Sequence, residues 1–358
     1  MRFLQNWFET LWYSENKKSI FNVLLYPVSF LYKALAEKRR AKFLSEQNPG
    51  LAVACPVVVV GNITVGGTGK TPLVIWLAEQ LQRKGYKPGI ISRGYGGKAK
   101  AFPVQVSIDS DPGYVGDEPA MMARRLNNIP VVIDPNRVRG AVYLNENLGC
   151  NIVISDDGLQ HYNLKRDIEI AVIDGRRGLG NGKCLPAGPL RESVSRLKSV
   201  DFVVINSNKD PIDFDADGIS GVSSKILADS IQMRLLPEKI NMLIGQSSEK
   251  PLIVSVVKDL NCPVHAVAGI GNPGRFFDTL ESMGILFQAH PFPDHYSYQA
   301  SDIIFPDEKD VIMTEKDAIK CRSIVESDKS HYFYLTIGAK LDNDFWPHLE
   351  AQLNKILN

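Results

Sequence analysis

Short apolar runs alternate with longer amphipathic stretches along most of the chain. Val57–Val60 is an unbroken apolar run, typical of a strand buried in a parallel sheet, and residues 72–81 after it have a helical composition. This alternation predicts a doubly wound α/β fold with a mostly parallel sheet, whose ligands bind at the carboxyl ends of the strands. Further strands are predicted at 87–92, 102–106, 131–134, 151–155, 168–174 and 201–205, with helices at 120–126 and 136–148.

The pattern changes after the last of these strands. From residue 209 to 250 the periodicity weakens, which indicates a linker with a few short antiparallel strands at 231–236 and 239–243. A second, smaller α/β domain is predicted from 251 to 358, after a nucleotide-binding core at 46–208. Its expected strands are 263–268, 311–313 and 332–336, and its expected helices are 275–283 and 346–357.

Residues 1–45 form a separate segment that is rich in aromatic and basic side chains. It carries eight basic and three acidic residues, a net charge of +5, and Pro27 interrupts its apolar run 20–32. That run is shorter than the roughly 20 residues that a spanning helix needs. We interpret the segment as an amphipathic helix that lies in one leaflet of a membrane. An amphipathic helix packed on the protein core is the alternative.

Charge and cysteine content exclude some classes of protein. The net charge of the whole chain is +1, which argues against a nucleic-acid-binding surface. The five cysteines are scattered without zinc-site spacing, as in a protein of a reducing cytoplasm.

A glycine-rich loop follows the valine run and ends in Gly69-Lys70-Thr71. Successive glycines let backbone N–H groups point into one concavity at a helix start, where phosphates bind. Lys70 would reach the β- and γ-phosphates and the Thr71 hydroxyl would ligate Mg²⁺. The loop departs from the strict G-x-x-x-x-G-K-[ST] pattern because Thr64 replaces its first glycine, so a glycine-rich hairpin is the alternative. The predicted nucleotide-binding residues are Thr64, Val65, Gly66, Gly67, Thr68, Gly69, Lys70 and Thr71.

Acidic residues occur at two other informative places. Asp156 and Asp157 follow the apolar strand 151–155, where a carboxylate can hold Mg²⁺, although an ordinary turn is also possible. Asp117 and Glu118 begin a helix, where acids act as caps or as a catalytic carboxylate at the sheet edge. His295 lies in F-P-D-H-Y and could exchange a proton with a carboxylate of the other domain.

The stretch 269–274 matches the dinucleotide pattern G-x-G-x-x-G. Its strand is short, and Pro273 lacks the N–H that a pyrophosphate would need. We therefore favour a tight strand-to-helix turn over a dinucleotide site.

Six motifs occur in one order: GNITVGGTGKTP, SRGY, GDEP, DDGLQH, LPAGPLRE and FPDHY. In this combination the chain resembles the tetraacyldisaccharide 4′-kinases. The resemblance implies ATP as co-substrate, Mg²⁺ as cofactor, and phosphorylation of the 4′-hydroxyl of the tetraacyldisaccharide 1-phosphate precursor of lipid A. It further implies a peripheral location at the cytoplasmic face of the bacterial inner membrane. No nucleic-acid or obligate protein partner is implied.

The resemblance also implies roles for individual residues. Asp117 would be the catalytic base, supported by His295, with Lys70 at the phosphates. Glu118 would assist with metal or geometry beside the metal residues Thr71, Asp156 and Asp157. Around the γ-phosphate or the sugar we expect Arg93, Arg137, Arg191 and Glu192. A membrane-associated ATPase or switch protein, and a small-metabolite ligase on the same scaffold, remain as alternatives.

Overall fold

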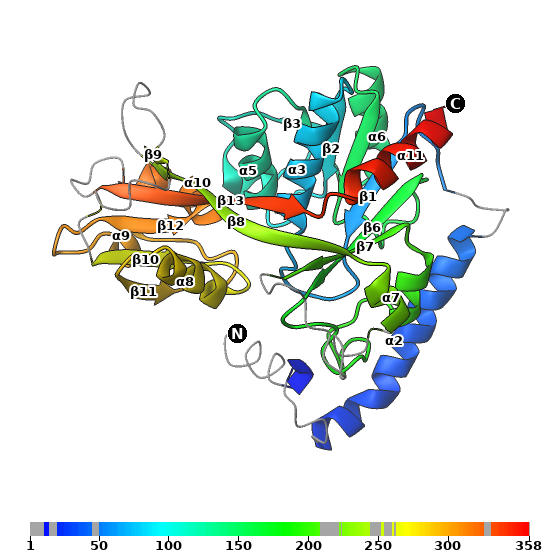
Figure 1. Ribbon diagram of the computed structural model, residues 1–358, viewed down its shortest axis with the longest axis horizontal. Coiled ribbons are helices and arrows are strands. Elements are labelled where there is room, and N and C mark those ends of the chain that lie inside the picture. Colours follow the sequence, from blue (N-terminus) through cyan, green and yellow to red (C-terminus); the bar gives the residue numbers. More distant parts are fainter. Residues whose placement is uncertain are drawn as a thin grey trace. The chain divides into compact units, whose positions relative to one another are not determined.

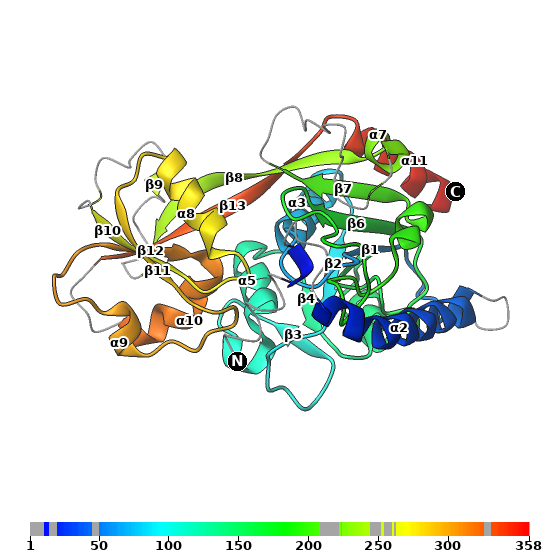
Figure 2. The same cartoon turned by 90° about the horizontal axis from the view of Figure 1, so that it is seen from below.

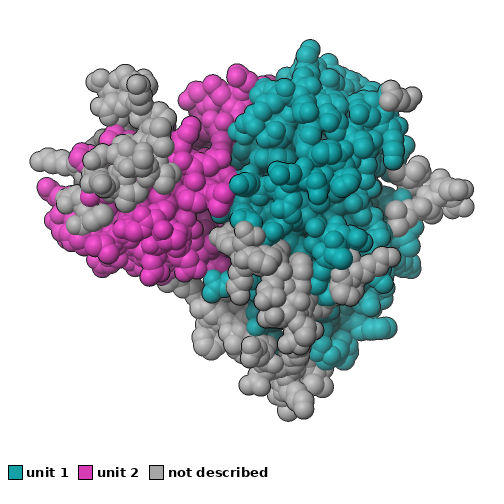
Figure 3. Space-filling model, in the orientation of Figure 1, with its two compact units in different colours: residues 1–93, 134–235, 339–358 teal, residues 94–133, 236–338 magenta. Residues whose placement is uncertain are grey.

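A computed structural model describes residues 11–13, 20–44, 50–207, 222, 224–243, 252–253, 260, 263–325 and 331–357. Parts of the predicted N-terminal segment and of the linker at 209–250 lie outside these residues. The chain forms two compact units, coloured separately in Figure 3. Unit 1 comprises residues 1–93, 134–235 and 339–358, and unit 2 comprises residues 94–133 and 236–338.

This division differs from the organisation expected from the sequence. Residues 94–133, predicted within the nucleotide-binding core, belong with the C-terminal residues of unit 2, and the final helix belongs to unit 1. The sequence pattern predicts domains that are continuous in sequence, whereas each unit combines segments that are far apart in the chain. Which segments belong together depends on their packing, which local pattern does not show.

Unit 1 contains the predicted parallel sheet, in the order β7-β6-β1-β5-β2 (Figures 1 and 2). Every residue of its central strand β1 is buried, as the valine run predicts. Val60 is in register with Asp156 of the neighbouring β5, so both strands end at the same edge of the sheet. The strands are β1 (Val57–Gly61), β2 (Pro88–Ser92), β5 (Ile152–Asp156), β6 (Ile168–Asp174) and β7 (Phe202–Asn206).

Helices pack on this sheet through apolar side chains spaced four residues apart. Leu73, Leu77 and Leu81 of α3 are fully buried. Phe345 of α11 is also fully buried, with its ring 5.7 Å from that of Trp76 and 5.3 Å from that of Phe202. These contacts place the last helix in unit 1. The helices of unit 1 are α2 (Ile20–Leu44), α3 (Lys70–Arg83), α6 (Arg137–Glu146), α7 (Ser224–Ala228) and α11 (Phe345–Leu357), with the 3-10 helix η1 at Val194–Ser199.

The long helix α2 lies along the loops that follow β6 (Figure 1). Ser29 Oγ donates to the carbonyl oxygen of Cys184 over 2.6 Å, and Lys183 Nζ lies 3.8 Å from the centre of the Tyr26 ring. No helix in the described part of the chain is long and apolar enough to span a membrane. One side of α2 therefore docks on unit 1, while large apolar side chains remain exposed at Leu24, Tyr26, Val28, Phe30, Leu31 and Leu35.

In unit 2 four strands pair in parallel, in the order β11-β10-β12-β13. Two antiparallel pairs, β3 with β4 and β8 with β9, complete its strands. The two short pieces predicted at 231–236 and 239–243 are one strand, β8, which starts in unit 1 and pairs there with β7 in parallel. The strands are β3 (Val104–Val106), β4 (Val131–Ile133), β8 (Ile231–Met242), β9 (Leu252–Ile253), β10 (Val264–Ala268), β11 (Phe287–Pro291), β12 (Val311–Thr314) and β13 (Tyr332–Leu341).

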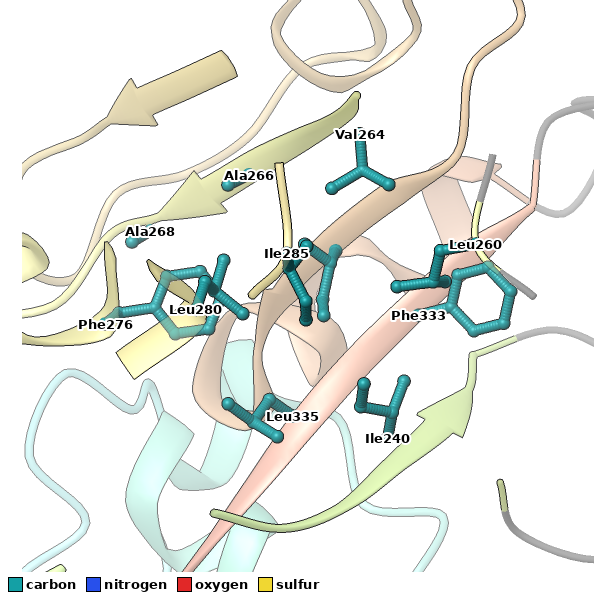
Figure 4. Close-up of a cluster of buried hydrophobic side chains, with 11 residues drawn as sticks. Ile240, Leu260, Val264, Ala266, Ala268, Phe276, Leu280, Ile285, Phe333 and Leu335 are labelled. Carbon is teal, nitrogen blue, oxygen red and sulfur yellow. The ribbon is translucent and has the colours of Figure 1, made fainter. Parts of the chain in front are cut away.

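One of the apolar core clusters of unit 2 lies between helix α8 and the strands (Figure 4). Phe276 and Leu280 of α8 pack there against β10, and Phe333 and Leu335 join from β13. Helix α10, which the sequence analysis did not identify, packs on α5 and β12. The helices of unit 2 are α4 (Pro112–Val115), α5 (Asp117–Arg125), α8 (Pro273–Ser282), α9 (Ala300–Ile303) and α10 (Glu315–Val325).

The G-x-G-x-x-G stretch connects β10 to α8, as a strand-to-helix turn would. The Gly269 N–H donates to Asp317 Oδ2 over 2.8 Å, and a Cβ at Gly269 would lie 2.4 Å from the Tyr298 hydroxyl oxygen. This glycine is therefore required by packing of the protein on itself, in agreement with the turn interpretation.

Candidate functional site

The second half of the glycine-rich loop leads from β1 into the first turn of α3. Gly69 adopts φ 93°, and a Cβ there would lie 2.5 Å from Asn206 Nδ2, so the position requires glycine. Lys70 and Thr71 are the first two residues of the helix that follows. The loop thus ends at a helix N-terminus, where backbone N–H groups and the helix dipole favour phosphate.

The first half of the loop pairs with residues 189–190 of the same unit. Thr64 is buried and forms an isolated antiparallel bridge with Leu190, and the Val65 N–H donates to the carbonyl oxygen of Pro189 over 2.9 Å. These contacts explain why Thr64 replaces the glycine of the strict pattern, because an extended, paired residue needs no glycine. The Val65 N–H, expected at the nucleotide, is taken up by this pairing.

Asn206 is a residue of this site that the sequence analysis missed. It ends β7, and its buried Nδ2 donates to the carbonyl oxygen of Thr68 over 3.0 Å. The Thr68 hydroxyl is buried and has no hydrogen-bond partner within the described residues. An unpartnered hydroxyl in such a loop suits a phosphate oxygen. In the sequence, Asn206 could have been recognised as a polar residue directly after the apolar run 202–205.

The two adjacent aspartates after β5 have different surroundings. Asp156 is buried, and its Oδ2 accepts a hydrogen bond from Ser92 Oγ at 3.2 Å. Asp157 adopts φ 47° and lies 3.5 Å from Lys70 Nζ through Oδ1. Arg191 Nη1 donates to the Asp157 carboxylate at 3.0 and 3.2 Å. Asp157 therefore connects the loop lysine to Arg191.

The charge of Asp157 follows from these neighbours. Its burial acts to raise the pKa of the carboxyl, but the Lys70 ammonium and the Arg191 guanidinium outweigh that effect. Together they lower the pKa of Asp157 from 3.8 to about 2. The carboxylate is thus ionised throughout the physiological range.

The four residues predicted around the γ-phosphate or the sugar differ in their surroundings. Arg93 is exposed and Arg191 is partly exposed. Arg137 is buried, donates to the backbone carbonyl oxygens of Asp134 and Asp156 at 3.1 Å each, and has its pKa lowered to about 10 by burial. The structure gives this guanidinium a direct role in holding the end of β5.

Glu192 is also turned into the protein. Its carboxylate accepts a 2.5 Å hydrogen bond from the Tyr162 hydroxyl and lies 3.2 Å from Arg196 Nε. These contacts hold the loop that carries Arg191, so a sugar or phosphate contact of Glu192 stays a sequence-based prediction.

Two side chains of unit 1 are suitable ligands for a magnesium ion. No group of three His, Cys, Asp or Glu side chains able to hold a metal occurs among the described residues. Mg²⁺ at phosphoryl-transfer sites needs only one or two protein oxygens, because phosphate and water complete its coordination. Asp156 is the last residue of β5, and Thr71 lies in the first turn of α3, after the loop that follows the adjacent strand β1. Carboxylate and hydroxyl oxygens are ligands that Mg²⁺ accepts, so this donor set fits the ion.

A second set of predicted residues meets in unit 2. Asp117 is the first residue of α5, and its Oδ2 lies 3.1 Å from His295 Nδ1. His295 adopts φ 57°, and its ring meets that of Tyr95 edge to face at 5.3 Å. The sequence suggests a partner of His295 in the other domain, whereas both residues belong to unit 2. Their pairing therefore requires no movement between the units.

Two lysines beside this pair were missed. Lys320 Nζ lies 4.0 Å from Asp117 Oδ2, and Lys316 Nζ lies 3.5 Å from His295 Nε2. Burial acts to raise the pKa of Asp117, but the hydrogen bond from His295 and the two ammonium groups lower it overall. The available signal was the spacing of Lys316 and Lys320, which places both on one face of α10.

Glu118 belongs to a different unit from the other predicted metal ligands. Its Oε1 is 3.7 Å from Lys316 Nζ in unit 2, whereas Thr71, Asp156 and Asp157 belong to unit 1. Because Glu118 contacts the Lys316 ammonium, we interpret it as a residue that helps to hold Lys316 beside Asp117.

Known proteins of one family are similar to this chain over nearly its whole length. The family model for tetraacyldisaccharide-1-P 4′-kinase, LpxK, matches residues 21–356. The tetraacyldisaccharide 4′-kinase of Hahella chejuensis is 43% identical over 355 residues, 98% of this chain and 97% of that protein. That of Legionella pneumophila strain Corby is 45% identical over 340 residues, 94% of each. A crystal structure of LpxK from Aquifex aeolicus in complex with ATP superimposes with a TM-score of 0.72 at 28% identity, covering 95% of this chain and 100% of that chain.

Proposed function

Because this chain belongs to the tetraacyldisaccharide 4′-kinase family, we propose that it transfers the γ-phosphate of ATP to the 4′-hydroxyl of tetraacyldisaccharide 1-phosphate, the lipid A precursor. One structural observation favours this kinase over an ATPase of the same fold. The Asp117–His295 pair provides an ionised carboxylate at a helix start, suited to accept the proton of an acceptor hydroxyl.

Unit 1 supplies the groups for the nucleotide in this proposal. Lys70 and the N–H groups at the start of α3 bind the β- and γ-phosphates, and the Thr68 hydroxyl donates to a phosphate oxygen. Thr71 and Asp156 would hold Mg²⁺, which when bound neutralises charge on the phosphates. Asp157 orients Lys70 and Arg191 toward the transferred group.

Unit 2 supplies the base. Asp117 takes the proton of the 4′-hydroxyl as the oxygen of that hydroxyl attacks phosphorus, and His295 orients the carboxylate.

Arg93 and Arg191, which belong to unit 1, are the predicted arginines with exposed surface, so we assign them to the sugar or the γ-phosphate.

We further propose that the chain acts peripherally at the cytoplasmic face of the inner membrane. Support comes from α2, where the exposed apolar side chains occur together with Lys33, Lys38, Arg39 and Lys42. Such a helix binds an anionic interface without spanning it.

The test is transfer of labelled γ-phosphate from ATP in the presence of vesicles that contain the tetraacyldisaccharide 1-phosphate. We expect label in the lipid that depends on Mg²⁺ and on Asp117. Release of the label only as free phosphate, at the same rate with and without the lipid, would instead identify the ATPase alternative.

A further inference from the structure

We propose that Lys316 is a positioning residue that sets the tautomer of His295 and so makes this ring a hydrogen-bond donor to Asp117. The proposal deepens the proposed function, because it rests on Asp117 as the base. It starts from the two ring nitrogens of His295, which face different groups. Nδ1 lies 3.1 Å from Asp117 Oδ2, and Nε2 lies 3.5 Å from Lys316 Nζ and 3.9 Å from Asp294 Oδ1, which is beyond hydrogen-bond distance.

The chemistry of these neighbours determines where the ring proton lies. A lysine ammonium has three donors and no acceptor, so the nitrogen that faces it must present a lone pair. In a neutral imidazole the proton is then on Nδ1, and it points at the carboxylate.

Lys316 itself is held in place. Its side chain is 12% exposed, and Nζ donates to Asp294 Oδ1 at 2.9 Å. The same Asp294 oxygen accepts a hydrogen bond from the backbone N–H of His295 at 3.0 Å, and Glu118 Oε1 lies 3.7 Å from Lys316 Nζ. Asp294 therefore connects the lysine to the backbone that carries the ring.

The second lysine of α10 acts on the carboxylate. Lys320 lies 4.0 Å from Asp117 Oδ2 and is held by Asp317 at 2.9 Å and by the carbonyl oxygen of Tyr296 at 3.2 Å. The charged groups that face the pair are thus Glu118 from α5, Asp294 from the loop after β11, and Lys316, Asp317 and Lys320 from α10.

This arrangement assigns the proton of the reaction to one oxygen. Asp117 Oδ2 is occupied by the ring N–H, so Oδ1 accepts the hydroxyl proton. The O–H bond breaks as the Oδ1–H bond forms, and the new O–P bond forms as the bond from phosphorus to the ADP oxygen breaks. His295 keeps its proton throughout, as a donor that positions the base.

The experiment is ¹⁵N NMR of the full-length protein with labelled histidine, using His295→Ala to assign the ring signals. We expect a protonated Nδ1 and an unprotonated Nε2 at neutral pH. A protonated Nε2 in the unmodified protein would overturn the proposal, and this measurement needs no folded lysine variant.

Lys316→Met should shift the tautomer toward protonated Nε2, while Lys316→Arg should retain the original signals. We expect kcat of Lys316→Met to fall about tenfold or more at unchanged KM for ATP, because the wrong tautomer removes the hydrogen bond to the base. Lys309→Met is the matched control, since Lys309 pairs with Asp307 at 3.0 Å on the surface of the same unit. Equal tautomers in all three variants would contradict the role of Lys316.

Failure of the proposed function gives a different result. If Asp117→Asn left lipid phosphorylation unchanged, the base assignment would fail while the tautomer of His295 stayed as found.

Discussion

Asn206 at the end of β7 donates from Nδ2 to the carbonyl oxygen of Thr68, across 3.0 Å. Since the strand order is β7-β6-β1, this bond connects the phosphate loop to a strand two positions away from the one that precedes it. The loop geometry therefore depends on the sheet as well as on the loop glycines.

Gly69→Ala should weaken ATP binding by about tenfold or more, because the new Cβ would displace Asn206 and the φ of 93° is strained for any L-residue. Isothermal titration calorimetry measures the affinity. Gly85→Ala is the control, because Gly85 has φ 87° with no atom within 4 Å of the added Cβ. Unchanged ATP affinity in Gly69→Ala would argue against phosphate binding by this loop.

Asp117→Ala should reduce kcat by about 10²- to 10⁴-fold while ATP still binds, since it removes the proposed base. His295→Ala should cost less, because a positioning group is less essential than the base. Single-turnover phosphate transfer gives both values, with Asp111→Asn, an exposed helix cap in the same unit, as control. The reverse ranking would make His295 the base.

The stabilisation by Asp157 should depend on pH. The carboxyl pKa is lowered from 3.8 to about 2 in the folded protein, so between these values the unfolded chain binds more protons. The contribution is fully present above about pH 4 and is lost as the pH falls toward 2. Urea unfolding of the ligand-free protein should show a gap between wild type and Asp157→Asn at pH 5 that narrows at pH 3. A gap that widened on acidification would contradict the ion pairs.

Arg125→Met should destabilise unit 2 by roughly 2–4 kcal/mol, because it leaves the largely buried Glu315 carboxylate without its cation. Arg125 ends α5 and donates to Glu315 at 3.0 Å, to the carbonyl oxygen of Ile337 at 2.9 Å, and to Glu238. Chemical denaturation measures the change. Arg83→Met removes an exposed pair with Glu79 and should cost below about 1 kcal/mol. Equal costs in both variants would show that the Arg125 cluster contributes nothing beyond a surface pair.

Replacing both Phe30 and Leu31 by Glu should lower the affinity for anionic vesicles by about tenfold or more, since each apolar side chain inserted in the interface is worth roughly 1.5–3 kcal/mol. These side chains are 74% and 60% exposed. Vesicle sedimentation measures binding, and Leu286→Glu, 67% exposed in unit 2, is the control. Equal binding of the Phe30/Leu31 variant and wild type would place the membrane contact elsewhere.

The sequence predicts those parts of the protein that depend on local pattern. The strand at Val57–Val60, the loop ending in Lys70, and the carboxyl-end position of Asp156 follow from apolar runs and turn residues, and the structure contains each of them. The motifs also predict that Asp117 and His295 act together. The structure brings these side chains to 3.1 Å, although the residues are 178 positions apart in the sequence.

The remaining features depend on packing between distant segments. Lys316 faces His295 only because α10 packs on α5. The four-residue spacing of Lys316 and Lys320 indicates a shared helix face, but not which group that face meets. Glu192 is a further example. Its carboxylate contacts Tyr162 and Arg196, so the side chain of this motif residue points into the protein. Neither local composition nor motif spacing carries that information.

The interleaving of the two units constrains the order of events during synthesis on the ribosome. Residues 94–133 emerge early, but they belong to a unit whose other strands lie at 236–338. Unit 1 is likewise incomplete until Phe345 packs beside Trp76 and Phe202. Since domains generally fold as units, neither can form its full core before almost the whole chain has been translated. A nascent or truncated chain would therefore expose apolar strands for most of its elongation, and we expect it to depend on chaperones.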